Sequence, residues 1–320
     1  WVALTAEPDD EENRQKDGQT VKTDQGWDRK GMTGTLLYET HSHTPLCKHA
    51  IGDPQDYAAM AFQRGFHGLL VTCHNPMPAG YSPGFRMPVD AFDDYLQMVF
   101  RARQIWRGRI DVRLGIEADY LPGYERWLEH QLQLADFQYV LGSVHPHVSE
   151  FRQRYATGSA VEAQRAYFRL LAQAAETRLF DCLSHPDIIK NERPEQWRAE
   201  PIMDDICHAL DRIAATGVAM ELNTSGKHKE IPEMNPFPQM LVEMRRREIP
   251  VVVGADAHEP ERVGEGFLEA LDLLEQCGYD CITFYINRVR TDVPIVAARE
   301  CLRPRHGAAA AATADTLYAD

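Results

Sequence analysis

Histidine and acidic side chains recur in short motifs along this sequence, and their types indicate metal chemistry. Nine residues stand out: His41, His43, His49, His74, Glu117, His145, His185, Asp256 and His258. Seven imidazoles and two carboxylates are more than an acid/base pair needs, and such a mixed donor set suits zinc, manganese or iron better than calcium or magnesium. At about four to six ligands per ion, the set is large enough for two or three divalent transition metal ions.

The spacing within two motifs lets neighbouring ligands project together. Residues i and i+2 of an extended chain point to the same side, which applies to His41 with His43 and to Asp256 with His258. A single His-x-His pair is common by chance, so the recurrence of the pattern carries the interpretation. The other six histidines are expected to be surface or structural residues, with His147 the strongest candidate for a role at the site.

Most of these motifs follow a short apolar run rich in β-branched residues, and the runs alternate with longer helical patterns, which is typical of repeated βα units. The expected strands span residues 34–40, 68–72, 110–116, 137–144, 180–184, 218–222, 250–254 and 281–285, and the clearest helices span 91–106, 160–177, 202–215, 235–247 and 266–277. Seven or eight such units favour a (β/α) barrel, with an open doubly wound sheet as the alternative. In a barrel the C-terminal strand ends meet at one rim, so the nine residues would share one pocket.

The folded unit is expected to span residues 32–304. Residues 1–31 are polar without a sustained apolar period, and residues 305–320 include a run of alanines, so both segments are expected to be disordered tails. The seven cysteines form no CxxC pair, which favours a reducing compartment, and no apolar stretch is long enough for a membrane span. We therefore expect a cytoplasmic protein with a single barrel domain and no membrane partner.

The charge balance bears on the partners. The chain has 34 Lys and Arg residues against 48 Asp and Glu residues, a net charge of −14 at pH 7. Proteins that bind long nucleic acids usually need a basic surface to displace counterions, so such a partner is not expected. Two or three divalent ions would outweigh the charges of Glu117 and Asp256 and make the pocket positive, which favours a small substrate that fits inside it. Oligomeric state does not follow from these patterns.

Taken in order, the motifs resemble those of the polymerase-and-histidinol-phosphatase (PHP) domain, and within it the histidinol-phosphatase branch. The motifs are HSHTPLCKHA, TCHNP, GIEADYLPG, VLGSVH, HPDIIK, ELNTSGKHK and GADAHEPERVG. The resemblance covers most of residues 32–302. It implies a distorted (β/α)7 barrel with a trinuclear metal site that hydrolyses phosphate monoesters, most specifically L-histidinol phosphate to L-histidinol and phosphate.

The resemblance also implies how three ions share the ligands. Carried over by position, it assigns His41, His43, Glu117 and Asp256 to the first ion, the bridging Glu117 with His145 and His185 to the second, and His49, His74 and His258 to the third. As a hypothesis, a hydroxide that bridges two ions attacks phosphorus in line with the leaving alcohol. Asp256 or His258 would then protonate the leaving alkoxide.

Basic residues in the loops after the expected strands are candidates for holding phosphate, although each is explained as readily by a solvated surface charge. They are Arg152, Arg154, Lys190, Lys227 and Lys229. Two features depart from the family pattern. Cys73 stands where many members have an acidic residue before the second-strand histidine, and PHVSEFRQRY follows His145 where histidinol phosphatases have a more aromatic segment. The second departure leaves the substrate less firmly indicated than the phosphatase class.

Two alternatives therefore stay open. The first is a PHP phosphoesterase that acts on another small phosphate ester or on a nucleotide. The second is a non-catalytic metal-binding module that kept the barrel and lost turnover, although loss of several ligands would mark that state and all nine are present. A metal-dependent amidohydrolase barrel usually carries a lysine at the end of a central strand, and none of the strand ends identified above has one.

Overall fold

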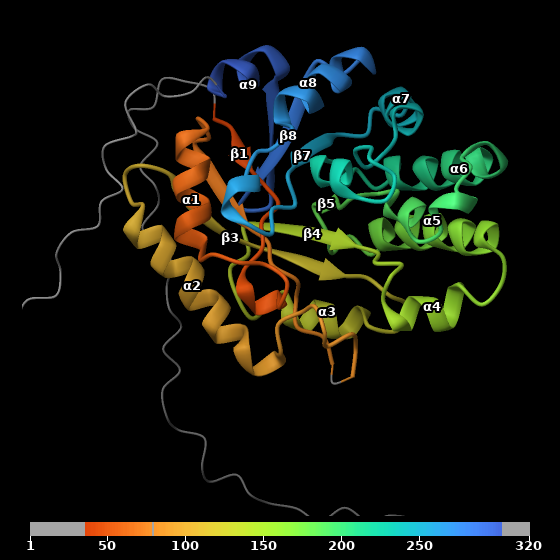
Figure 1. Cartoon of the computed structure of the whole chain (residues 1–320), viewed down its shortest axis with the longest axis horizontal. Helices are drawn as coiled ribbons and strands as arrows, with labels where there is room; N and C mark the ends of the chain where they lie inside the picture. The colour runs from red at the N-terminus through yellow and green to blue at the C-terminus, as the bar shows by residue number, and fades with distance from the viewer. Residues whose placement is uncertain (1–35, 79, 303–320) are drawn as a thin grey trace, which may run out of the picture. The chain divides into compact units, whose positions relative to one another are not determined.

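The computed structural model describes residues 36–78 and 80–302, so the expected tails at 1–31 and 305–320 lie outside the described residues. Its central feature is a seven-stranded parallel sheet in which the strands follow one another in chain order (Figure 1). The strands are β1 (Tyr38–Glu39), β2 (Gly68–Val71), β3 (Asp111–Asp119), β4 (Tyr139–Ser143), β5 (Cys182–Leu183), β6 (Ala219–Asn223) and β7 (Val251–Gly254). The expected (β/α)7 barrel is confirmed, because an open doubly wound sheet would reverse its strand order.

Backbone hydrogen bonds between the segments that follow β1 and β7 close the barrel. Ser42 forms a parallel bridge with Ala257, in which His43 N donates to Ala257 O at 2.9 Å and Ala257 N donates to His41 O at 3.0 Å. The chain therefore pairs with β2 along β1 and with the end of β7 just beyond it. The strand expected at 34–40 corresponds to the two residues of β1, and residues 34–35 lie outside the described part.

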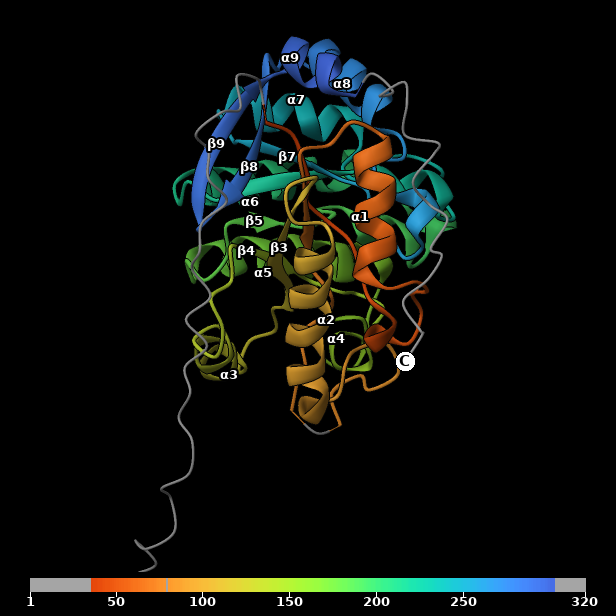
Figure 2. The ribbon, with the colours of Figure 1, turned by 90° about the vertical axis from the view of Figure 1, so that its left-hand side faces the viewer.

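Helices cover the outside of the barrel (Figure 2). They are α1 (Pro54–Gln63), α2 (Phe92–Ile105), α3 (Glu125–Gln131), α4 (Ser149–Tyr155), α5 (Ala160–Glu176), α6 (Met203–Ala214), α7 (Pro238–Arg246), α8 (Phe267–Gln276) and α9 (Ile295–Cys301). The five predicted helices are confirmed to within about three residues at each end. Local chemistry sets these ends: Ser159 and Glu162 form a capping box at the start of α5, and Pro238 opens α7.

The eighth expected strand, at 281–285, is not a barrel strand. Its counterpart β8 (Cys281–Ile286) pairs antiparallel with β9 (Val289–Pro294). The two residues between these strands both have positive φ, which is typical of the tight turns that reverse a hairpin. The hairpin lies at the N-terminal end of the barrel, where Arg288 N donates to Gln138 O just before β4. Because β1 and β7 already close the barrel, they leave no edge at which β8 could insert.

Two of the barrel strands, β2 and β7, are apolar along their whole length. The sequences GLLV of β2 and VVVG of β7 are buried at every position, as expected for parallel strands that are covered on both faces. Among the described helices, none is both long enough and apolar enough to cross a membrane. β2 and β7 therefore form an apolar support, whereas β1, β3 and β6 carry the buried carboxylates Glu39, Glu117 and Glu221.

Glu39 links the two strands that close the barrel. Its side chain is fully buried and accepts hydrogen bonds from four backbone N–H groups, those of Thr40 (3.0 Å), His41 (3.1 Å), Ala255 (3.0 Å) and Gly264 (2.7 Å). Burial raises the pKa of Glu39 to about 7, against the lowering effect of these donors. The Glu39 side chain thus pairs with backbone N–H groups of the segment after β1 and of the segment after β7, the first and last strands of the sheet.

Replacing Glu39 by alanine should lower the free energy of unfolding by about 3 kcal/mol or more, because each buried N–H left without a partner costs about 1–3 kcal/mol. Urea denaturation followed by circular dichroism measures this change. The exposed Glu129 on α3 offers a control, and Glu129→Ala should shift the free energy by less than about 0.5 kcal/mol. Equal effects of the two replacements would contradict the role assigned to Glu39.

Candidate metal centre

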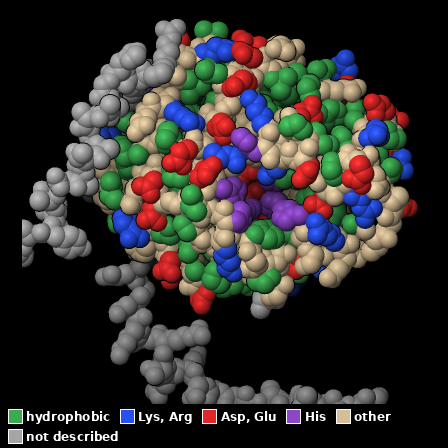
Figure 3. All heavy atoms as spheres, viewed as in Figure 1, with side chains coloured by type: hydrophobic (Ala, Val, Ile, Leu, Met, Phe, Trp, Pro, Cys, Tyr) green, Lys and Arg blue, Asp and Glu red, His purple; other side chains and the backbone are tan. Residues whose placement is uncertain are grey.

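The nine proposed ligands lie at the C-terminal end of the barrel. Figure 3 shows histidine side chains gathered in a hollow of this face, with acidic side chains at its floor. The ligands come from the ends of six strands: His41, His43 and His49 follow β1, His74 follows β2, Glu117 lies in β3, His145 follows β4, His185 follows β5, and Asp256 and His258 follow β7. Strand ends of a closed barrel converge on one rim, which explains how ligands so distant in sequence meet.

Glu117 lies at the centre of this cluster, and its two carboxylate oxygens face different histidines. Around Oε2 lie His74 Nδ1 at 2.8 Å, His41 Nε2 at 3.5 Å and His43 Nε2 at 3.6 Å. Around Oε1 lie His185 Nε2 at 3.1 Å, His145 Nε2 at 3.4 Å and the hydroxyl of Ser143, which donates at 2.6 Å. A carboxylate between two groups of imidazoles has the arrangement of a bridging ligand, with one oxygen available to each of two ions.

Asp256 completes the group around the first-strand histidines. Its Oδ1 is 3.0 Å from His43 Nε2 and 3.6 Å from His41 Nε2. Its Oδ2 accepts a hydrogen bond of 2.9 Å from the hydroxyl of Ser225. One ligand atom each from His41, His43 and Asp256 lie within 4.8 Å of one another, a spacing that a single ion can span.

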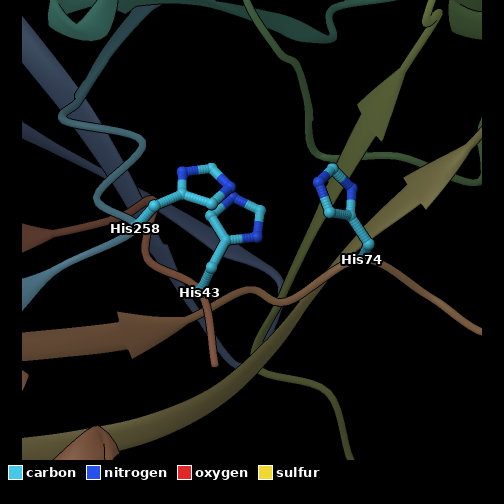
Figure 4. A group of neighbouring side chains, drawn as sticks. All are labelled: His43, His74 and His258. Atoms are coloured by element: carbon cyan, nitrogen blue, oxygen red, sulfur yellow. The ribbon is translucent and has the colours of Figure 1, made fainter. Parts of the chain in front are cut away.

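A third group of imidazoles lies beside this one. Figure 4 shows the rings of His43, His74 and His258, which come from three different strand ends, around one space. The ring centroids of His43 and His258 are 4.0 Å apart, and those of His43 and His74 are 4.6 Å apart. His49 extends the group, with its ring centroid 4.5 Å from that of His258 and 5.4 Å from that of His74.

Four of the histidines are oriented by an acceptor at Nδ1. These pairs are His41 with Glu221 (2.7 Å), His145 with Asp119 (2.8 Å), His49 with the Cys47 carbonyl (2.8 Å) and His258 with the Asp256 carbonyl (3.0 Å). When Nδ1–H donates to such an acceptor, Nε2 keeps its lone pair and can bind a metal. Outer partners of this kind fix the ring and make it a better ligand.

Buried polar atoms without partners show that the donor set fits metal ions. Within the described residues, five site atoms are buried and make no hydrogen bond: His41 Nε2, His43 Nδ1, His74 Nδ1, Glu117 Oε2 and His258 Nε2. Buried polar atoms normally find partners, because leaving one unpaired costs about 1–3 kcal/mol. A divalent cation can satisfy buried imidazole nitrogens and carboxylate oxygens that have no hydrogen-bond partner.

The electrostatics of the site attract positive charge. Burial raises the pKa of Glu117 and of Asp256, but the surrounding imidazoles outweigh it and hold both values well below the usual range. Burial lowers the pKa of His145, but Asp119 and Glu117 outweigh it and raise that pKa to about 9. Metal ions supply the same compensating charge without protonating the ligands.

Two of the proposed ligands have unusual backbone conformations. His185 has a φ of 23° and Asp256 a φ of 49°, values that residues other than glycine rarely adopt. His185 N donates to Glu221 at 2.9 Å, and the side chain of Asp256 is held by Ser225. Such strain persists where the surrounding structure enforces it, and it concentrates at functional sites.

Sequence reasoning missed Glu221 and Asp119, both fully buried. Glu221 lies in β6, the only barrel strand for which no ligand was predicted. A carboxylate within the otherwise largely apolar run AMELN is the sequence feature that could have identified it. Asp119 lies two residues after Glu117 on β3 and therefore projects to the same side. Nothing in the sequence distinguishes Ser143 and Ser225 from other serines.

The basic candidates for holding phosphate have other partners. Arg152 pairs with Glu192 (2.8 Å), Arg154 donates to the Pro122 carbonyl (2.9 Å), and Lys227 is 3.4 Å from Glu269. Lys190 is fully buried and donates to Asp187, Glu233 and the Met234 carbonyl, which uses all three of its N–H bonds. Lys229 differs from these, because its charge is among those that lower the pKa of Asp256 against the effect of burial.

Cys73, which replaces the family's acidic residue, is fully buried. Its sulfur accepts a hydrogen bond of 3.2 Å from Thr44 Oγ1. The neighbouring His74 is positioned by Glu117 and by the edge-on ring of Phe85, whose centroid is 5.5 Å away.

Replacing Glu221 by glutamine should weaken zinc retention about 10- to 100-fold, because His41 loses a charged acceptor at Nδ1. Competition with a coloured chelator measures retention for the purified protein. Glu269→Gln, which changes an exposed carboxylate away from the cluster, provides the matched control. Retention that is the same in both variants would contradict the orienting role of Glu221.

Comparison with known proteins agrees with this geometry. The family model of the PHP domain matches residues 39–225. The chain is 37% identical over 263 residues to a Deinococcus radiodurans protein named probable histidinol-phosphatase. The alignment covers 79% of this chain and 97% of that relative. It is 24% identical over 262 residues to the histidinol-phosphatase of Bacillus subtilis, covering 72% of this chain and 97% of that protein.

A solved structure shares the fold. The histidinol phosphate phosphatase of Lactococcus lactis, complexed with zinc, L-histidinol and phosphate, aligns with a TM-score of 0.68 at 17% identity. The alignment covers 80% of this chain and 100% of that one. Together with the ordered motifs and their convergence on one rim, these matches show that the chain belongs to the PHP domain family.

Proposed function

We propose that this protein is a metal-dependent phosphatase that hydrolyses L-histidinol phosphate to L-histidinol and phosphate. The observation that carries the proposal is the position of Glu117, whose two oxygens face separate groups of histidines at the rim of the barrel. The name of the Deinococcus relative and the ligands of the Lactococcus structure support the substrate. Among the described residues, six cysteines are free thiols, which is compatible with the cytoplasmic location that we propose: Cys47, Cys73, Cys182, Cys207, Cys277 and Cys281.

The nine ligands would hold two or three ions of zinc, manganese or iron, with Glu117 as the bridge. When bound, such ions lower the pKa of a coordinated water from 15.7 to about 7 and neutralise charge on the phosphoryl oxygens. The chain's own residues orient the site: Glu221 and Asp119 fix His41 and His145, and Ser143 fixes Glu117. No serine or cysteine nucleophile is required.

The remaining tasks are binding the phosphate ester and protonating the leaving alcohol. We propose Lys229 for phosphate binding, because this half-buried residue lies in the segment that follows β6, at the C-terminal end of the barrel, and its charge lowers the pKa of Asp256. Asp256 and His258 are the two residues that we propose for proton donation. His258 is the more accessible of the two, with a side chain that is 23% exposed against 7% for Asp256.

An aromatic wall borders the cluster and suits a flat, small substrate. The ring of Phe85 lies 4.9 Å from that of the exposed His147 and 5.5 Å from that of His74. Histidinol carries an imidazole, which can stack on aromatic rings at such distances. The wall therefore supports a small ring-bearing alcohol as the leaving group.

Replacing Glu117 by glutamine should reduce kcat by about a thousandfold or more, because the amide cannot bridge two cations that supply several kcal/mol of transition-state stabilisation. Phosphate release measured with added zinc or manganese tests this. Circular dichroism should show an unchanged fold, and Glu129→Gln on the surface of α3 should keep full activity. Near-normal turnover of the Glu117 variant would remove this residue as the bridging ligand.

The substrate assignment predicts a clear preference among phosphate monoesters. With manganese or zinc, kcat/KM for L-histidinol phosphate should exceed that for nucleoside monophosphates by at least about a hundredfold, because we expect the site to recognise the alcohol that the Lactococcus structure binds, L-histidinol. A panel of small phosphate esters and nucleotides, assayed by release of inorganic phosphate, makes the comparison. Equal rates across the panel would point instead to a broader phosphoesterase.

A further inference from the structure

One fully buried thiol lies among the proposed metal ligands. Cys47 ends the short 3-10 helix η1 (Pro45–Cys47), between His43 and His49 in the sequence. The next residue, Lys48, has a φ of 72°, so the chain turns sharply there. His49 Nδ1 then hydrogen bonds the Cys47 carbonyl at 2.8 Å. The turn returns the imidazole of His49 to the side on which the sulfur lies.

The same loop is tied to the strand end that carries His258. Ile51 N donates to the His258 carbonyl at 2.9 Å, and His43 N donates to the carbonyl of Ala257 at 2.9 Å. Backbone hydrogen bonds thus hold both ends of the segment 43–51 against the segment after β7. The position of the Cys47 sulfur relative to His258 is therefore set by the barrel closure and not by a free loop.

The ligand atoms of Cys47 and these histidines are close enough to share an ion. One atom each from Cys47, His49 and His258 lie within 4.8 Å of one another. In a tetrahedral zinc site, with Zn–S of about 2.3 Å and Zn–N of about 2.0 Å, ligand atoms lie about 3.5 Å apart. Small side-chain rotations therefore suffice to bring the three atoms onto one ion.

Both imidazoles keep a second ring nitrogen for a metal, because Nδ1 of each makes a hydrogen bond. Nδ1 of His258 hydrogen bonds the Asp256 carbonyl, and its Nε2 is buried and unpaired within the described residues. His49 likewise uses Nδ1 for the Cys47 carbonyl, which leaves Nε2 for a metal. Two imidazole nitrogens and a sulfur form a donor set that is typical of zinc.

We propose that Cys47 is a sulfur ligand of the ion held by His49 and His258, and that this position of the centre selects a thiophilic ion such as zinc. The inference rests on the metal centre proposed above. As the ion binds, the S–H bond of Cys47 breaks, a sulfur–metal bond forms and the proton passes to solvent. Manganese, which prefers oxygen ligands, is disfavoured at a position with a thiolate ligand.

Cys73 does not take this role, although it neighbours Cys47. Its sulfur accepts from Thr44 Oγ1 at 3.2 Å and donates to the Thr44 carbonyl at 3.7 Å. The Cys73 sulfur lies within 4.8 Å of ligand atoms of His43 and Cys47. The group formed by Cys47, His49 and His258 does not include it. Cys73 is thus a buried thiol that packs behind the ligand.

Cobalt substitution of the full-length protein tests sulfur ligation directly. The protein is stripped with a chelator, reloaded with Co²⁺ under argon and examined for sulfur-to-cobalt charge transfer in the near-ultraviolet. Wild type should show this absorption, and Cys47→Ser should lose it. Cys73→Ser should retain it, as should the matched control Cys281→Ser, which changes a free thiol of the β8–β9 hairpin at the opposite end of the barrel.

The possible failures are distinguishable. Bound cobalt without charge transfer in wild type, or charge transfer that survives Cys47→Ser, overturns the sulfur ligand and leaves the metal centre intact. A wild-type protein that binds no metal overturns the centre itself. Zinc-edge X-ray absorption of the wild type needs no variant: a sulfur scatterer at about 2.3 Å is expected, and a shell of nitrogen and oxygen alone contradicts the proposal.

Discussion

A buried carboxylate surrounded by imidazoles is the interaction on which the rest of the site depends. Glu117 is almost inaccessible to solvent, and an isolated charge in that position would be strongly destabilising. Asp256, Asp119 and Glu221 add further buried negative charge nearby, and an arginine, Arg86, pairs with Asp119. The other carboxylates face imidazoles, so divalent cations are the natural compensation. Those cations would also give an acidic protein a local positive field for phosphate.

Barrel closure and ligand placement are parts of one structure. Ser42 and Ala257 form the bridge that closes the barrel. Each of them lies between two proposed ligands in the sequence, Ser42 between His41 and His43 and Ala257 between Asp256 and His258. Glu39 stabilises the same junction by accepting four backbone hydrogen bonds, one of them from the ligand His41. The strained conformation of Asp256 is held at this junction as well. A change that loosens the closure should therefore disturb metal binding before it unfolds the barrel.

The two ends of the barrel serve different purposes. The β8–β9 hairpin covers the N-terminal end, where Tyr38 stacks on Phe284 and Arg288 pairs with Asp181. The C-terminal end carries every proposed ligand and the loops that border them. This separation lets the loops vary in sequence, as the segment after His145 does, while the strands and the covered end maintain stability.

The sequence by itself determined the residue types, their order and the helical and strand periods. Those features indicated the barrel, the five long helices, the PHP family and the nine candidate ligands, because period and motif spacing depend on residues close together in the chain. Only the tertiary structure decided which groups meet. His41 finds its acceptor in Glu221, 180 residues away, each oxygen of Glu117 faces its own histidines, and Lys190 is buried among acceptors. It also turned the strand expected at 281–285 into a hairpin. Such contacts depend on register and on closure of the barrel, which are set by the packing of distant segments and leave no local pattern in the sequence.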